Sequence, residues 1–146
     1  MIKKRSKQAA LSCETRIKVR FSEIDSMQVV WHGEYVRYFE DGREEFGRQF
    51  AGLGYADIAA SGTLAPVVDA SLQYKKPLRM NDTAVIETRY IDSDAAKICF
   101  EYTIRRESDG EVVATGSTMQ VFVDMDYELQ LFQPEFFQKW RSRWIK

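Results

Sequence analysis

One long helical pattern followed by four β-rich segments most constrains what this chain can fold into. From Gly33 onward, apolar residues recur at mostly helical offsets with charged residues between them; they are Tyr35, Val36, Tyr38, Phe39, Phe46 and Phe50. The segments 63–74, 83–91, 96–106 and 112–124 have the composition of strands. A sheet with one apolar face needs a cover, and this helix is the only large candidate. We therefore predict an α+β fold in which a mostly antiparallel sheet packs on the helix.

Turn signals between the β-rich segments predict which strands are neighbours. Short connections are marked by Pro77 with Asn81–Asp82, by residues 92–94 and by Asp109–Gly110. Such links favour sequential antiparallel neighbours over parallel crossovers. Alternation predicts an apolar face in the third segment, made of Ile98, Phe100, Tyr102 and Ile104, and one in the fourth, made of Val113, Met119, Val121 and Val123.

The remaining segments extend this body at both ends. Residues 16–21 alternate basic and apolar side chains, which predicts a half-buried strand with Ile17, Val19 and Phe21 on one face. The long helix should end near Gly52 or Gly54, and residues 55–60 should form a short helical turn. Residues 1–12 are predicted to be a flexible tail, and residues 134–146 a C-terminal helix begun by Pro134. The chain, 1–146, is predicted to be a single domain.

Charge and composition exclude several functional classes. The 146 residues carry 21 basic and 22 acidic side chains, a net charge of -1, which argues against generic nucleic-acid binding. No run approaches the roughly 18 apolar residues of a membrane span. Cys13 and Cys99 fit no metal or redox spacing, a single histidine excludes a multi-histidine metal site, and no glycine-rich phosphate loop follows a strand. We expect a reduced, cytoplasmic protein without a metal ion or an organic cofactor.

The junction between the first strand and the long helix holds the residues best suited to chemistry. Asp25 lies between the apolar residues Ile24 and Met27, where partial burial can keep a carboxylate available as a base or nucleophile. An ordinary turn or capping aspartate explains the same spacing. His32 stands near the helix start, where the helix dipole favours a neutral imidazole, and it is equally well explained as a packing or capping residue.

Gly33 is more informative than either of these residues alone. A glycine lets another group approach the backbone closely, and helix-start amides can donate to a carbonyl oxygen that becomes negative during acyl transfer. Trp31 and Tyr35 fit either an acyl pocket or plain core. Glu40, about two helical turns further on, fits either a supporting role in the site or an ion pair with an arginine such as Arg43.

A resemblance to a known family lies in the stretch RFSEIDSMQVVWHGEYVRYFEDGREE and extends from about residue 16 to residue 123. This pattern resembles the hotdog-fold thioesterases of the 4-hydroxybenzoyl-CoA thioesterase and YbgC-like group. In that family a strand ends in an acid-x-aspartate-like turn. A small residue or methionine, usually a glycine, then two aliphatic residues, an aromatic or histidine pair and an aromatic-rich helix follow it. Here these places are filled by Asp25, Met27, Gln28, Val29, Val30, Trp31, His32, Tyr35, Phe39 and Glu40. Gln28 departs from the usual glycine.

The resemblance implies a hydrolase that cleaves acyl-CoA or acyl-carrier-protein thioesters without a cofactor. Asp25 would be the catalytic carboxylate, which attacks the thioester carbonyl or activates water. The backbone N–H of His32 would polarise the carbonyl oxygen. The imidazole of His32 is a second catalytic candidate, since many YbgC-like members keep that histidine. The segment 63–77 would border the acyl pocket.

The resemblance also implies an architecture and partners. In the hotdog fold an antiparallel sheet wraps a long central helix, and two such units join their sheets into a dimer that often pairs again into a tetramer. The phosphates of CoA would meet basic side chains, for which the candidates are Lys97, Arg105, Arg106 and the trio Lys75, Lys76 and Arg79. Two other functions stay open: a hotdog hydratase or dehydratase, and an acyl-CoA-binding module without turnover.

Overall fold

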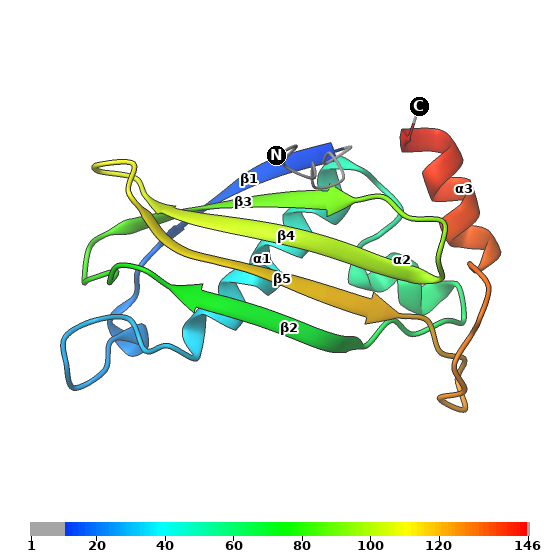
Figure 1. The fold of residues 1–146 in the computed structure, drawn as a ribbon, viewed down its shortest axis with the longest axis horizontal. Coiled ribbons are helices and arrows are strands. Elements are labelled where there is room, and N and C mark those ends of the chain that lie inside the picture. The colour runs from blue at the N-terminus through cyan, green and yellow to red at the C-terminus, as the bar shows by residue number, and fades with distance from the viewer. Residues whose placement is uncertain (1–10, 146) are drawn as a thin grey trace, which may run out of the picture.

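A five-stranded antiparallel sheet curves around one long helix in the computed structural model of this chain, which describes residues 11–145 (Figure 1). The strands are β1 (Leu11–Lys18), β2 (Val67–Tyr74), β3 (Thr83–Ile91), β4 (Lys97–Arg106) and β5 (Val112–Val121). The helices are α1 (Glu34–Gln49), α2 (Tyr55–Ala60) and α3 (Glu135–Trp144), and a 3₁₀ turn spans Phe21–Glu23. The predicted α+β class is therefore confirmed.

The strand order, β1-β3-β4-β5-β2, agrees only in part with the predicted neighbours. β3, β4 and β5 are sequential antiparallel neighbours, as expected. β2 is not beside β3, because it pairs with β5 and forms one edge of the sheet. The link 75–82 instead crosses the end of the β4–β5 hairpin, where Lys75 N–H donates to the Val113 carbonyl oxygen at 2.8 Å and Arg106 donates to that of Pro77 at 2.7 Å.

The core lies between α1 and the concave face of the sheet. The helix buries one stripe, in which the ring of Phe39 stacks on that of Tyr102 with centroids 4.0 Å apart. A Cβ added to Gly42 would lie 2.2 Å from Thr88 Oγ1, so a glycine is what lets α1 pack this closely against β3. The predicted inner face of β4 is buried along its length: Ile98, Phe100, Tyr102 and Ile104.

The predicted apolar faces are wrong at several positions. Phe21 is 78% exposed, because strand β1 ends at Lys18 and the chain turns before Phe21 can face the core. Val36 lies on the outer side of α1 and is 46% exposed. In β5 the inner face contains Thr118 rather than Met119, because the Thr118 hydroxyl forms a 2.6 Å hydrogen bond with the buried Tyr102 hydroxyl. A hydrogen-bonded threonine is thus accommodated where alternation predicted an apolar face.

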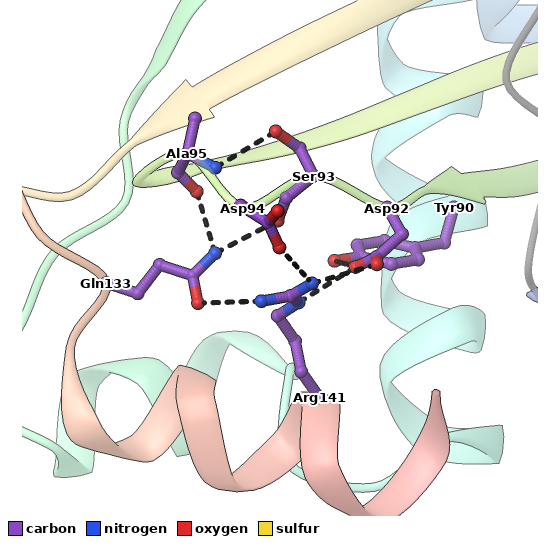
Figure 2. Close-up of polar contacts among 7 residues, drawn as sticks. All are labelled: Tyr90, Asp92, Ser93, Asp94, Ala95, Gln133 and Arg141. Carbon is purple, nitrogen blue, oxygen red and sulfur yellow. Dashed lines mark hydrogen bonds and ion pairs between the residues drawn. The ribbon is translucent and has the colours of Figure 1, made fainter. Parts of the chain in front are cut away.

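Helix α3 covers the end of α1 that lies farthest from the Asp25 junction. It begins directly after Pro134, as predicted, and buries Phe137 and Trp140. The Trp140 indole N–H donates to the Phe50 carbonyl oxygen at 2.8 Å, just beyond the end of α1. Arg141 then fixes α3 to the β3–β4 turn through two 2.9 Å contacts with Asp92 (Figure 2).

The predicted ends of the chain differ from the observed ones. Residues 11 and 12 belong to β1, so the predicted tail is too long by two residues, and residues 1–10 lie outside the described part of the chain. Helix α1 ends at Gln49, before Gly52 and Gly54, and α2 occupies the predicted range 55–60. Within residues 11–145, no helix is both long enough and apolar enough to cross a membrane.

Candidate active site

A tight turn carries Asp25. The turn is closed by an antiparallel bridge between Ile24 and Val30 and by a 2.9 Å bond from Asp25 N–H to the Val29 carbonyl oxygen. Oδ1 of Asp25 accepts the Met27 N–H at 2.8 Å. The aspartate therefore has the turn-forming role that its spacing allowed, and its partly buried carboxylate still has Oδ2 free of hydrogen bonds within the described residues.

Gln28 retains the turn although it replaces the glycine usual in the resembling family. Its φ angle is 68°, in the left-handed region where glycine carries no Cβ penalty. Its N–H donates to the Asp25 carbonyl oxygen at 3.0 Å. The departure at position 28 therefore leaves a closed turn around Asp25, with the glutamine side chain exposed.

The same turn occurs a second time, around Asp124. A bridge joins Val123 to Leu129, Asp124 N–H donates to the Glu128 carbonyl oxygen at 3.0 Å, and Asp124 Oδ1 accepts the Asp126 N–H at 2.9 Å. Tyr127 repeats the left-handed conformation with φ 64°. The two turns lie at opposite ends of the sheet, the first in blue and the second in orange in Figure 1. The main-chain conformation of this turn is therefore not unique to Asp25.

The Asp25 turn leads directly to the start of α1. Trp31 N–H donates to the Glu23 carbonyl oxygen at 2.8 Å, and Val30 N–H donates to that of Leu78 at 2.8 Å. The first bond joins the two ends of the turn to each other, and the second holds the turn against the link between β2 and β3. Glu34 N–H then donates to the Trp31 carbonyl oxygen at 2.9 Å, and the helix begins.

The helix start combines an open backbone with an aromatic cover. Among the described residues, the N–H groups of His32 and Gly33 have no hydrogen-bond acceptor, which leaves them available to an anionic oxygen. The ring of Trp31 lies over Gly33, where an added Cβ would be 2.2 Å from ring atom Cζ3. The His32 side chain is exposed, with its ring centroid 5.1 Å from that of Trp31.

The predicted pocket residues divide between core and surface. Tyr35 is 3% exposed and packs edge-on against Tyr74, and burial raises the pKa of its hydroxyl. Trp31, by contrast, is half exposed. Glu40 is also exposed, and its alternative as an ion pair with Arg43 is not found among the described residues, because Arg43 donates to the Tyr102 hydroxyl at 3.1 Å.

Glu40 lines a cavity of about 540 Å³ between α1, α2 and the inner face of the sheet near the start of β4. Most of the lining is aliphatic, and it comes from α1, α2, the segment before β2 and the first residues of β4; examples are Leu53, Ile58, Leu64, Pro66 and Ile98. The cavity reaches Val67, the first residue of β2, whereas Tyr74, the last, contacts the helix start through a bond from its hydroxyl to the His32 carbonyl oxygen. Cavity and Asp25 turn thus lie at opposite ends of β2.

The candidate basic residues are not gathered in one place. Lys97 begins β4 and Arg105 lies eight residues along it, a separation of about 26 Å in an extended strand. Arg106 contacts the carboxylates of Asp82 and Asp109. Lys75, Arg79 and Arg105 are exposed at the end of the sheet that holds the Asp25 turn, whereas Lys76 pairs with Glu111.

Sequence reasoning did not identify the buried Glu23 as a site residue. Its side chain is buried, although it lies two residues before Asp25. The only sequence signal is the acid-x-acid order of Glu23 and Asp25 ahead of the helix. Within residues 11–145, no cluster of three or more potential metal ligands occurs.

Comparison with known proteins places this chain in a family. Residues 19–141 match the thioesterase-like superfamily. The chain is 34% identical to YneP of Bacillus subtilis, provisionally named an acyl-CoA thioesterase, over 88% of each protein. It is 29% identical to the chloroplastic acyl-acyl carrier protein thioesterase ATL3 of Arabidopsis thaliana, over 78% of this chain and 60% of ATL3. The DHNA-CoA thioesterase of Staphylococcus aureus superposes with a TM-score of 0.81 at 27% identity, covering 90% of this chain and 89% of that one. The predicted hotdog fold is confirmed.

Proposed function

Because this chain belongs to the thioesterase-like superfamily, among the acyl-CoA and acyl-acyl carrier protein thioesterases, we propose that it hydrolyses an acyl thioester with Asp25 as the catalytic carboxylate. The observation that carries the proposal is the connection of the Asp25 turn to a helix start whose His32 and Gly33 amides are open. A carboxylate and an oxyanion site are the two groups that metal-free thioester cleavage requires.

The proposed reaction divides the chemistry between these two groups. The carboxylate of Asp25 either attacks the thioester carbon or removes a proton from the attacking water. The carbonyl oxygen becomes negative as the new C–O bond forms, and the His32 N–H donates to it at the positive end of α1. In the water route the C–S bond then breaks, the proton held by Asp25 passes to the departing sulfur, and the thiol and the free acid leave. In the attack route, breaking the C–S bond leaves a thiolate and an acyl anhydride on Asp25; water hydrolyses the anhydride to the free acid, and the thiolate takes up a proton. In this scheme the exposed imidazole of His32 has a supporting role.

We further propose that two copies pair along β2 to complete the site. The outer edge of β2 has no partner strand in the described chain, and Asp69 is its only charged residue, so it lacks the charges that protect edge strands. Antiparallel pairing about a two-fold axis brings the Val67 end of one copy beside the Tyr74 end of the other. The cavity of each copy would then adjoin the Asp25 turn of its partner.

This arrangement favours an aliphatic acyl group. Leucine, isoleucine, valine, alanine and proline supply eight of the fifteen residues that line the cavity, and the charged ones, Glu40, Arg43 and Glu44, all come from α1. The cavity volume is in the range of small-molecule pockets. For the other half of the substrate, Lys75, Arg79 and Arg105 lie at the Asp25 end and are exposed to phosphates, whether of CoA or of a carrier-protein prosthetic group. Lys97 is too far away to join them in the same copy.

The decisive test is Asp25→Asn with Asp124→Asn as its matched control. Asparagine keeps an Oδ1 acceptor, so each turn can keep its side-chain bond to the backbone. We expect Asp25→Asn to lower kcat for thiol release by about 10²- to 10⁴-fold, the usual range for a group that transfers a proton. Asp124→Asn should leave kcat within about twofold, because this turn has no open helix start beside it.

The substrates for this test are saturated acyl-CoAs of increasing chain length and the matching acyl carrier proteins. Full turnover by Asp25→Asn would refute the assignment of Asp25. An enoyl-CoA included in the series separates hydrolysis, which releases a free thiol, from hydration, which does not. Gel filtration of both variants at several concentrations reports whether the copies remain paired.

A further inference from the structure

The two matching turns differ in one position that matters. Glu23 precedes the first turn as Phe122 precedes the second, and the main-chain bonds agree: Trp31 N–H donates to the Glu23 carbonyl oxygen and Gln130 N–H to that of Phe122, both at 2.8 Å. Both side chains are buried, with 6% exposure for Glu23 and 0% for Phe122. Since a phenylalanine supports the second turn, forming the turn does not require a carboxylate.

Burial of a carboxylate is costly unless it is hydrogen-bonded. Oε1 of Glu23 accepts the Tyr38 hydroxyl at 2.9 Å and the Arg20 N–H at 2.9 Å. Tyr38 belongs to α1 and is 1% exposed, and burial together with the nearby Glu23 carboxylate raises the pKa of Tyr38, so its hydroxyl remains a donor at any working pH. Glu23 thus connects the chain before the Asp25 turn to the body of the helix.

The path of the chain explains what this connection does. Asp25 follows Glu23 by two residues, and the proposed oxyanion donor, His32, follows Trp31, which is bonded to the Glu23 main chain. The Glu23 carbonyl oxygen therefore holds the chain at Trp31, where it leaves the turn, and the Glu23 side chain holds α1 through Tyr38. A shift of either one would change the separation between the carboxylate and the helix-start amides. Misplacement by about 1 Å can lower a rate by about a hundredfold.

We propose that Glu23 and Tyr38 form a positioning pair that sets the distance between the Asp25 carboxylate and the oxyanion site at the start of α1. The inference rests on the proposed role of Asp25. Neither residue of the pair touches the substrate in this scheme. Their effect is on kcat, through geometry, and not on substrate affinity.

The test compares Tyr38→Phe with Tyr90→Phe. Tyr90 is a close structural match, because it is fully buried and its hydroxyl donates to a carboxylate, Asp92, at 3.0 Å. Tyr90 lies beside the α3 contacts, away from the Asp25 turn (Figure 2). We expect Tyr38→Phe to lower kcat by about tenfold or more, with KM changed by less than about twofold, while Tyr90→Phe leaves kcat within about twofold at a similar loss of thermal stability.

Substitutions at Glu23 separate positioning from direct participation. Glu23→Gln keeps an oxygen that can accept from Tyr38 and Arg20, so it should retain most of kcat. Glu23→Leu removes the acceptor and imitates the apolar Phe122 of the second turn, so it should lose as much kcat as Tyr38→Phe. The double variant Glu23→Leu/Tyr38→Phe should lose no more than Glu23→Leu alone, because both changes remove one interaction.

Three results would overturn the proposal. Equal kcat values for Tyr38→Phe and Tyr90→Phe would mean that the Tyr38–Glu23 bond only stabilises the fold. Loss of activity in Glu23→Gln as complete as in Asp25→Asn would make Glu23 a reacting group. Additive losses in the double variant would mean that the residues act separately. If Asp25→Asn is inactive while Tyr38→Phe is fully active, only this inference fails; if Asp25→Asn is active, the proposed role of Asp25 fails first.

Discussion

The hydroxyl of Tyr74 donates a 2.8 Å hydrogen bond to the main-chain carbonyl oxygen of His32. Tyr74 is the last residue of β2, so this bond joins the edge of the sheet to the start of α1. Tyr74→Phe removes the bond and keeps the ring against Tyr35. We expect kcat to fall by about twofold to tenfold, the equivalent of one net hydrogen bond, with little change in thermal midpoint because Tyr74 is half exposed. Steady-state kinetics with an acyl-CoA measure this effect, and an unaltered kcat would mean that the bond does not orient the His32 amide.

Gly33→Ala should disturb the helix start without unfolding it. The backbone of Gly33 has helical angles that alanine adopts easily, but the new Cβ would collide with the ring of Trp31. Since Trp31 is half exposed, its ring can rotate outward. We expect kcat to fall by roughly tenfold as the ring and the nearby amide shift. The double variant Trp31→Ala/Gly33→Ala should have the same kcat as Trp31→Ala alone, because the ring that collides is gone. A lower kcat in the double variant would mean that alanine at position 33 changes the backbone itself.

Ala59→Trp should shorten the acyl chain that the enzyme accepts. Ala59 lines the cavity from α2 and is exposed, so a large side chain can fill the cavity without disturbing the core. We expect kcat/KM to fall for long acyl-CoAs and to remain near the wild-type value for short ones. Ala56→Trp is the matched control, since Ala56 is exposed on the same helix and does not line the cavity. Equal chain-length profiles for the two variants would mean that the acyl group binds elsewhere.

Arg141→Met should weaken the attachment of α3 and leave kcat unchanged. Arg141 contacts Asp92 twice, and its guanidinium holds the pKa of Asp92 below its usual range. About a fifth of each side chain is exposed, which screens the pair, so we expect a loss of about 1–2 kcal/mol in the free energy of unfolding at pH 7. Lys139→Met, which removes an ion pair whose side chains are 75% and 80% exposed on the same helix, should change stability far less.

The contribution of the Arg141–Asp92 pair should also depend on pH in one direction. A carboxyl group whose pKa is lowered in the folded state stabilises that state above the pKa of the unfolded chain, here 3.8 for an ordinary aspartate. As the pH falls below that value the unfolded chain binds the proton first, and the stabilisation is lost. Denaturant unfolding of wild type and Arg141→Met should therefore give stabilities that converge toward acid pH. A constant difference across this range would mean that lost packing, not charge, causes the effect.

Local patterns in the sequence were sufficient to predict where the helices and strands lie along the chain, but not which strands are neighbours in the sheet. Strand β3 occupies the predicted range 83–91, and the aromatic stripe correctly located α1, because a single period determines each of them. The place of β2 beside β5 depends on pairing between distant segments, which no local period reveals. The cavity was missed for the same reason, since its lining extends from Glu40 to Tyr127.

A candidate site could be proposed from the sequence where chemistry coincides with a short motif. Asp25, His32 and Gly33 could be selected because they follow one another in a single junction. The burial of Glu23 could not be foreseen, because its hydrogen-bond partner Tyr38 is fifteen residues away and lies on the inner side of a helix. Asp124 was included in a predicted strand, although it forms the same turn as Asp25.

The exposed edge of β2 affects the solubility of an unpaired copy at high protein concentration. The open edge of this eight-residue strand exposes the backbone donors and acceptors of alternate residues, two valines at one end and a single charge. It is therefore a template on which any extended peptide can add a strand. An isolated copy should therefore aggregate more readily than a paired one. The edge that we expect to complete the catalytic site would then also be the part of the surface that most needs to be covered for the protein to stay dispersed.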